Sequence, residues 1–115
     1  MGRPPSVQSW NLMEVAAPAG IREPVVVHSG NEARAVLIVL NPGQELGDHQ
    51  VKENAWVTVL DGHVEIRAGE ETAAAGVGSL FRFDPDERHS LRSAEGARIL
   101  LLLAPWPGDG HYRGG

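Results

Sequence analysis

Residues 43–62 read GQELGDHQVKENAWVTVLDG, and the end of this stretch has the pattern of a β-strand. Ala55 to Leu60 is a run of apolar and β-branched residues that ends at Asp61-Gly62, a common turn sequence. The same stretch carries His49, and His89 follows forty residues later. Each histidine stands beside a turn signal, and we expect each to open a short run of alternating apolar residues. This arrangement predicts that the two imidazoles approach one end of a small β-barrel, where ligands commonly bind.

Strand-like runs separated by turn residues continue on both sides of this stretch. They are residues 25–27, 35–40, 63–67, 70–75, 80–83, 89–92 and 97–103. Val64 and Ile66 alternate with polar residues, which predicts one buried face, whereas residues 36–40 and 99–103 are apolar on both faces and must be covered twice. Short strands at this spacing predict an all-β sandwich or barrel. Residues 72–75 are too short for a stable helix, and we expect them in an exposed edge strand.

The composition is that of a single folded domain. The 115 residues carry 15 acidic and 10 basic side chains, a net charge of −5, and we expect no nucleic-acid partner because no basic stripe is present. The absence of cysteine excludes disulfides and thiolate metal sites. No apolar run has the length of a membrane span, so we expect a cytoplasmic protein without a membrane partner. We divide the chain into an N-terminal arm with a first strand (1–24), a barrel (25–104) and a C-terminal tail (105–115).

Two motifs in this chain resemble those of the cupins. Gly43, His49 and Gly62 follow the spacing of the first cupin motif, G-x5-H-x-H-x3-E-x6-G. Residues 78–89 resemble the second motif, which ends in a P-x-G-x-x-H turn, with His89 at the histidine position. The resemblance covers about residues 25–106. It implies the double-stranded β-helix, or jelly-roll barrel, of the small single-domain cupins, which are often dimeric.

The ligand positions of these motifs are incomplete. In metal-dependent cupins, two histidines and a glutamate of the first motif join the histidine of the second motif to hold a divalent ion. Here His49 and His89 occupy the first and last of these positions, but Val51 and Ala55 stand at the second-histidine and glutamate positions. A catalytic metal usually needs three protein ligands, so these two histidines alone would hold Mn, Fe, Ni or Zn weakly. A third ligand could come from Gln44, Asp48, Gln50 or Glu53.

Three functional classes are consistent with these residues. The first, which we favour, is a cupin that binds a small, largely apolar ligand in a barrel pocket rimmed by two histidines, with no assigned reaction. The second is a metal-dependent enzyme of the dioxygenase or isomerase type, which the resemblance implies. The third is a structural dimer without a functional pocket. For the first class, the predicted ligand-binding residues are His49, His89, Val51, Ala55 and Trp56.

The remaining histidines and the acidic run before His89 have simpler interpretations. We expect His28, His63 and His111 in solvent-facing turns or loops. Residues 84–87 hold three carboxylates, which either orient His89 through a carboxylate contact or form an ordinary Asp-Pro-Asp turn.

A homodimer is predicted from the strands that are apolar on both faces. The terminal segments carry Trp10, Leu12 and Trp106, which could lie on the surface or reach a neighbouring copy. Symmetric pairing would cover apolar surface that one small barrel cannot hide alone.

Overall fold

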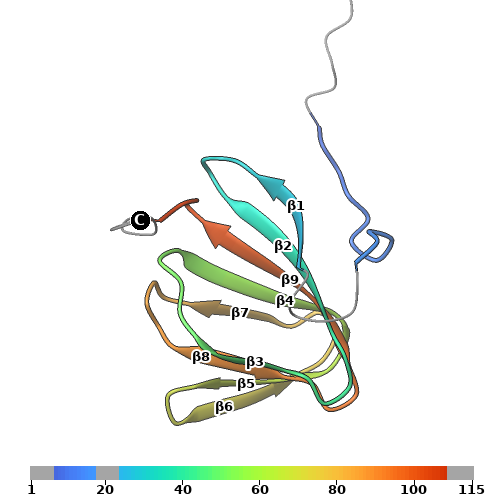
Figure 1. Cartoon of the computed structure of the whole chain (residues 1–115), viewed down its shortest axis with the longest axis vertical. Coiled ribbons are helices and arrows are strands. Elements are labelled where there is room, and N and C mark those ends of the chain that lie inside the picture. The colour runs from blue at the N-terminus through green and yellow to red at the C-terminus, as the bar shows by residue number, and fades with distance from the viewer. Residues whose placement is uncertain (1–6, 18–23, 109–115) are drawn as a thin grey trace, which may run out of the picture.

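The computed structural model of the chain describes residues 7–17 and 24–108, except for the side chains of residues 48 and 49. The strands in this part of the chain are β1 (Val25–Ser29), β2 (Arg34–Leu40), β3 (Glu45–His49), β4 (Asn54–Gly62), β5 (Val64–Ala68), β6 (Glu71–Ala75), β7 (Leu80–Phe83), β8 (His89–Arg92) and β9 (Ala97–Ala104). They form a large sheet, in the order β1-β2-β9-β4-β7, and a small sheet, in the order β3-β8-β5-β6 (Figure 1). The predicted all-β jelly-roll fold is confirmed. The described residues form no helix that could serve as a membrane span.

The apolar core lies between the two sheets, because alternate residues of each strand point inward. On the inner face of the large sheet, Ile38, Ile99 and Val59 are cross-strand neighbours. Val64 and Ile66 of the small sheet belong to the same core and are 2% and 4% exposed. The predicted alternation of these two residues with polar neighbours is therefore confirmed.

The large sheet also buries side chains on its outer face. Leu37 of β2 is fully buried, although its neighbour Val36 fills the core on the other face of the strand. Nearby on the outer face, Arg98 of β9 donates hydrogen bonds to the backbone carbonyls of Leu12 and Val15 and so ties residues 7–17 to the sheet. Residues 7–17 themselves contain no strand. The expectation that residues 36–40 are covered on both faces is confirmed.

Two expectations about histidines are wrong. His28 lies in β1 and not in a loop, and its Nε2 is 3.0 Å from Oε1 of Glu32. This hydrogen bond holds the pKa of Glu32 below its ordinary value. His49 ends β3 instead of opening a strand. Gly47 and an irregularity in the pairing of β3 with β8 interrupt the alternation that would have revealed this strand in the sequence.

The glycine that ends the first motif is required by a close backbone contact. Gly62, the last residue of β4, has a φ of 79°. A Cβ atom at this position would lie 2.2 Å from the carbonyl oxygen of Gly96, in the turn between β8 and β9. The turn after β4 and the turn between β8 and β9 can therefore approach each other only if residue 62 has no side chain.

Candidate functional site

The two motifs meet where β3 and β8 pair. The backbone register places His49 opposite His89. In the turn before β8, Asp86 donates its N–H to the carbonyl oxygen of Val51 at 2.7 Å, and its carboxylate lies 2.7 Å from Nζ of Lys52. The structure therefore brings the two distant motifs together, as the sequence analysis expects.

His89 lies inside the barrel and not at its rim. Its side chain is 1% exposed and stacks on Phe83, with ring centroids 4.0 Å apart and 6° between the ring planes. Nδ1 of His89 is 3.1 Å from the carbonyl oxygen of Glu87, which can only accept, so Nδ1 carries the proton of this hydrogen bond. This hydrogen bond to a backbone carbonyl orients the ring. The expectation of an imidazole at the rim is corrected for His89, because an aromatic ring covers it.

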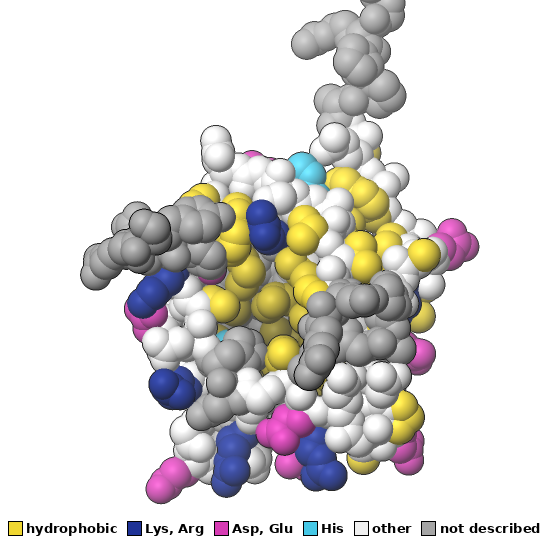
Figure 2. Space-filling model, in the orientation of Figure 1, with side chains coloured by type: hydrophobic (Ala, Val, Ile, Leu, Met, Phe, Trp, Pro, Cys, Tyr) yellow, Lys and Arg dark blue, Asp and Glu magenta, His cyan; other side chains and the backbone are white. Residues whose placement is uncertain are grey.

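The other positions of the first motif line an apolar interior. Ala55 is fully buried, and its cross-strand partners are Phe83 of β7 and Leu103 of β9. Val51 is partly buried and packs against the same core. From the side shown in Figure 2, hydrophobic side chains gather in a hollow near the middle of the molecule. A carboxylate at position 55 would be costly to bury in such surroundings.

Glu53 is a buried acid beside the motif positions. Its side chain is 0% exposed, and Oε2 accepts the N–H of Gly108 at 2.7 Å. A Cβ atom on Gly108 would lie 2.4 Å from the carbonyl oxygen of Lys52, so the segment after β9 passes very close to the residues before β4. Trp106 of this segment packs against the core, and Cζ of Arg34 lies 4.0 Å from its ring centroid. Glu53, one of the possible third ligands, therefore anchors this segment to the barrel.

Trp56 lies on the opposite face of β4 from Ala55. Its cross-strand partners are Leu102 and Arg82, and Cζ of Arg82 lies 5.8 Å from its ring centroid. Successive residues of a strand point to opposite faces, so Trp56 faces the outside of the large sheet. The structure does not bring it together with the other predicted ligand-binding residues.

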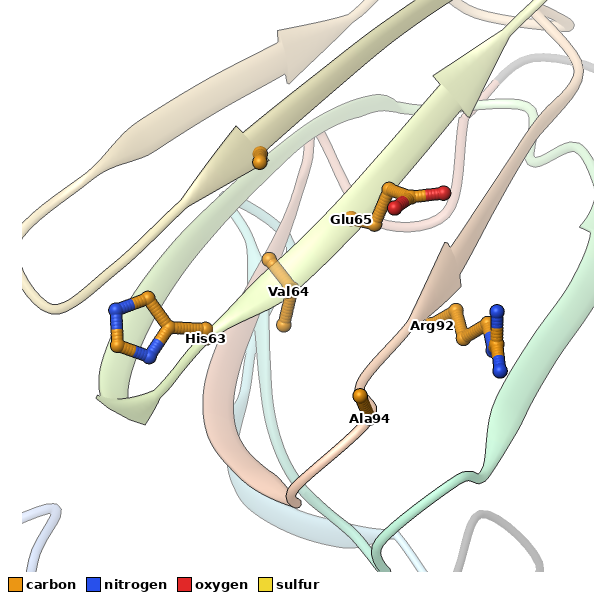
Figure 3. Close-up of a pocket in the computed structure, with 6 residues that line it drawn as sticks. His63, Val64, Glu65, Arg92 and Ala94 are labelled. Atoms are coloured by element: carbon orange, nitrogen blue, oxygen red, sulfur yellow. The ribbon is translucent and has the colours of Figure 1, made fainter.

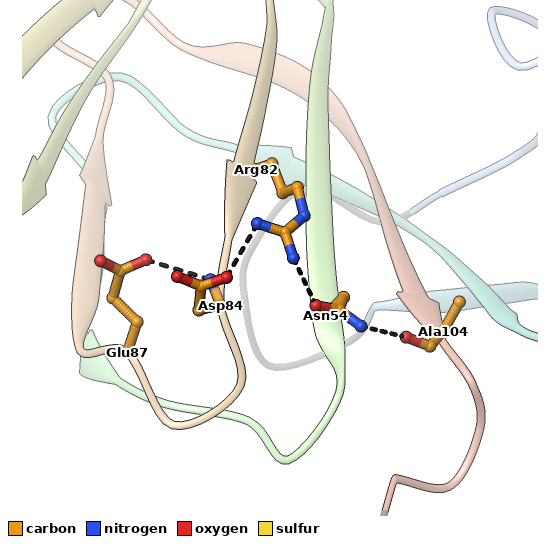
Figure 4. Close-up of polar contacts among 5 residues, drawn as sticks. All are labelled: Asn54, Arg82, Asp84, Glu87 and Ala104. Carbon is orange, nitrogen blue, oxygen red and sulfur yellow. Dashed lines mark hydrogen bonds and ion pairs between the residues drawn. The ribbon is translucent and has the colours of Figure 1, made fainter.

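A polar network holds the turn after β7 (Figure 4). Arg82 donates to Oδ1 of Asp84 at 2.8 Å and to Oδ1 of Asn54 at 2.7 Å. Asp84 in turn donates its N–H to Oε1 of Glu87 at 3.1 Å. Asp86 stands at the glycine position of the second motif and has a φ of 66°, a conformation that aspartate tolerates better than most residues. These contacts are those of an ordinary acidic turn.

A cavity of about 220 Å³ lies between β6 and β7, and we call it the seam cavity. These two strands are the edges of different sheets and are not paired with each other. The apolar wall of the cavity is formed by Ile66, Ala68, Ala73, Phe81 and Phe83. Its polar lining residues are Glu71, Thr72, Arg82 and Glu87.

The seam cavity depends on small side chains in β6. Ala73 is the cross-strand partner of Ile66 and shares its inner face. Its methyl group leaves space that a larger side chain would fill. This cavity was not predicted from the sequence, although the run Ala73-Ala74-Ala75 and the aromatic pair Phe81 and Phe83 were visible signals.

A second cavity, of about 170 Å³, lies beside β5 and β8 (Figure 3). Glu65 and Arg92 are cross-strand partners at one side of it, and the exposed His63 lies at the other end, beyond Val64. His63 faces solvent, as predicted. Its apolar lining residues are Val64, Ala74 and Ala94, so it gives a weaker reason to expect an apolar ligand than the seam cavity, whose wall includes two aromatic rings.

The described residues do not fit a cupin metal centre. Among them, no group of three or more histidine, cysteine, aspartate or glutamate side chains could hold a metal ion. Val51 and Ala55 provide no side-chain donor atom at the second-histidine and glutamate positions, and the side chain of His49 lies outside the described part of the chain. We therefore derive no reaction step that uses a metal.

Comparisons with known proteins agree with this architecture. The chain is similar to an uncharacterized conserved protein with a double-stranded β-helix domain from Klebsiella pneumoniae, with a TM-score of 0.75 and 22% identity over 90% of this chain and 95% of that one. It is also similar to an RmlC-like cupin from Desulfovibrio desulfuricans, with a TM-score of 0.74 and 25% identity over 86% of this chain and 97% of that one. A comparison with curated proteins gives no match. The cupin domain model matches residues 36–104, more than half of the chain, and the chain therefore belongs to the cupin domain family.

Proposed function

We propose that this cupin binds a small, largely apolar molecule, and that the seam cavity receives it. The supporting observation is an aliphatic and aromatic wall, which includes Ile66, Phe81 and Phe83, beside a few polar residues. The cavity of about 220 Å³ is larger than the apolar cavity of about 150 Å³ that is enough to hold benzene. A molecule with one ring and a short substituent therefore fits its volume.

Residues of the two cupin motifs contact the aromatic wall of this site. His89 stacks on Phe83, and Phe83 lines the seam cavity. Ala55 is the cross-strand partner of Phe83. In the proposed site, His89 and Ala55 fix the position of the aromatic wall, and the ligand contacts the wall itself.

We assign no reaction to this site. A metal-dependent dioxygenase or isomerase would need a set of donor atoms that the described residues do not provide. Binding without an assigned reaction is the function that the apolar wall supports best.

The proposal is tested by filling the cavity. Ala73→Leu places a larger side chain on the inner face of β6, whereas Ala74→Leu makes the same change on the outer face of the same strand. NMR titration with phenol, benzyl alcohol, benzylamine and benzoate measures binding to each protein. For the wild type we expect at least one dissociation constant below about 1 mM, which corresponds to about −4 kcal/mol.

The two variants should differ clearly in their affinity for the probe. Ala73→Leu is expected to weaken binding of that probe at least about tenfold, because its side chain occupies the ligand's space. Ala74→Leu is expected to bind as the wild type does. Equal binding by wild type and Ala73→Leu, or no binding of any probe to the wild type, would contradict the proposal.

A homodimer is a further part of the proposal. The outer face of the large sheet presents Leu80, which is 65% exposed, and the half-buried Trp56, Leu100 and Leu102. A second copy would cover these side chains by symmetric pairing.

Sedimentation analysis at tens of micromolar tests the homodimer, and we expect a dimer for the wild type. Leu80→Lys should shift it toward monomer, whereas Val77→Lys, at a turn residue of similar exposure (66%), should not. A wild-type monomer would count against the dimer.

A further inference from the structure

The charge of Arg82 is already satisfied outside the seam cavity. Its guanidinium hydrogen-bonds to Asp84 at 2.8 Å and to Asn54 at 2.7 Å (Figure 4). Its Cζ also lies 5.8 Å from the ring centroid of Trp56. Arg82 alternates along β7 with Phe81 and Phe83, so its side chain leaves the strand on the face opposite to theirs. The positive charge nearest to the cavity is therefore directed away from it and balanced by a carboxylate.

The remaining charged residues that line the cavity are acidic. Glu71 opens β6 and is the cross-strand partner of Ala68, which places both on the inner face. Glu87 lies in the turn before β8, and its Oε1 accepts the N–H of Asp84 at 3.1 Å. A carboxylate has about four acceptor sites on its two oxygens, so this hydrogen bond leaves acceptor capacity for a ligand. Both glutamates are exposed to solvent at the cavity mouth.

The apolar wall favours the same sign of charge. One face of Phe83 is stacked on His89, whereas Phe81 is only half-buried. The face of an aromatic ring carries the negative part of its quadrupole, which attracts cations that approach within about 6 Å. An anion would meet two carboxylates and an arginine that is already engaged. Electrostatics and shape therefore select the same class of molecule.

We infer that the ligand of the seam cavity is a small organic cation, with an apolar body of about one ring and a protonated amine or quaternary ammonium group directed at Glu71 and Glu87. This inference rests on the proposed function, because it names the class of molecule that the proposed cavity receives. It goes further in requiring a positive charge. A neutral ring of the same shape binds more weakly, and an anion of the same shape binds weakest.

Three probes of similar shape and different charge test the inference: benzylammonium, benzyl alcohol and benzoate. In NMR titrations at low salt, we expect benzylammonium to bind about tenfold more tightly than benzyl alcohol, and benzoate to bind least. The preference for the cation should fall as ionic strength rises, because salt screens charges at an exposed mouth. Benzyltrimethylammonium then separates amines from quaternary ammonium ions.

Matched variants locate the charge that matters. The double variant Glu71→Gln, Glu87→Gln should reduce the preference for benzylammonium over benzyl alcohol to about twofold or less. Glu65→Gln, Glu95→Gln removes the same net charge elsewhere and should keep the preference. The salt dependence of the wild type gives the same test if the first variant does not fold.

The outcomes distinguish this inference from the proposed function. If benzyl alcohol or benzoate binds as tightly as benzylammonium while Ala73→Leu still blocks binding, the inference is overturned and the proposed function stands. If no probe binds the wild type at about 10 mM, both are overturned. A cation preference that both double variants retain equally would also overturn the inference, since its source would lie elsewhere.

Discussion

His89 and Phe81 both belong to the inner side of the barrel, yet they have different surroundings. His89 is 1% exposed, stacked on Phe83 and hydrogen-bonded to a backbone carbonyl. Phe81 is half-buried and lines a cavity of about 220 Å³. Of the described motif positions, Ala55 and His89 are fully buried among packed side chains, whereas a cavity lies at the seam between β6 and β7.

This difference indicates that polar residues at or beside family motif positions can serve stability. Glu53 anchors the segment after β9, and His89 supports an aromatic ring. Ligand-sized space instead depends on small residues such as Ala73, at a place where two sheet edges are not joined by backbone hydrogen bonds. We therefore propose that stability and binding involve different residues, which substitutions can separate.

The largest expected effect is that of His89→Ala on stability. Removing a fully buried ring leaves a cavity and one unstacked face of Phe83, so we expect a loss of about 3 kcal/mol in the free energy of unfolding. Urea denaturation measures this change. His63→Ala, at an exposed histidine, should change the free energy by less than about 0.5 kcal/mol. A loss below about 1 kcal/mol for His89→Ala would mean that the motif side is not tightly packed.

Glu53→Ala should have a smaller but clear effect on stability. It removes the acceptor of the Gly108 N–H in a buried place, and we expect a loss of about 2 kcal/mol in the same measurement. Glu71→Ala, at the exposed mouth of the seam cavity, should change stability by less than about 0.5 kcal/mol. Equal losses in the free energy of unfolding for Glu53→Ala and Glu71→Ala would contradict the difference between the packed motif side and the mouth of the seam cavity.

Most of the fold could be predicted from the sequence. The alternation of Val64 and Ile66 corresponds to β5, because a period of two marks a strand with one buried face. The continuous apolar runs within residues 35–40 and 97–103 correspond to β2 and β9, and residues 89–92 correspond to β8. β3 was missed, since Gly47 and the pairing irregularity between Leu46 and His49 interrupt that period. A β-bulge is defined by how two strands pair, so the residues of one strand do not reveal it while the partner strand is unknown.

The candidate site was harder to predict. The meeting of positions 49 and 89 follows from the motif spacing and is observed in the register of β3 and β8. The burial of His89 depends on Phe83, which lies in the other sheet. The residues next to His89 in the sequence therefore do not predict its burial. The seam cavity depends on the distance between two unpaired edge strands, and that distance is a property of the whole barrel. Trp56 was assigned to the pocket, but alternation along β4 already places it opposite Ala55.

The most direct test of the proposed ligand site is a crystal structure of the wild-type protein with benzylamine. We predict density for the ring against Phe81 and Phe83, beside Ala73, with the amine nitrogen toward Glu71 and Glu87. Density for the probe beside His89 and Ala55, with the space between β6 and β7 empty, would contradict this account.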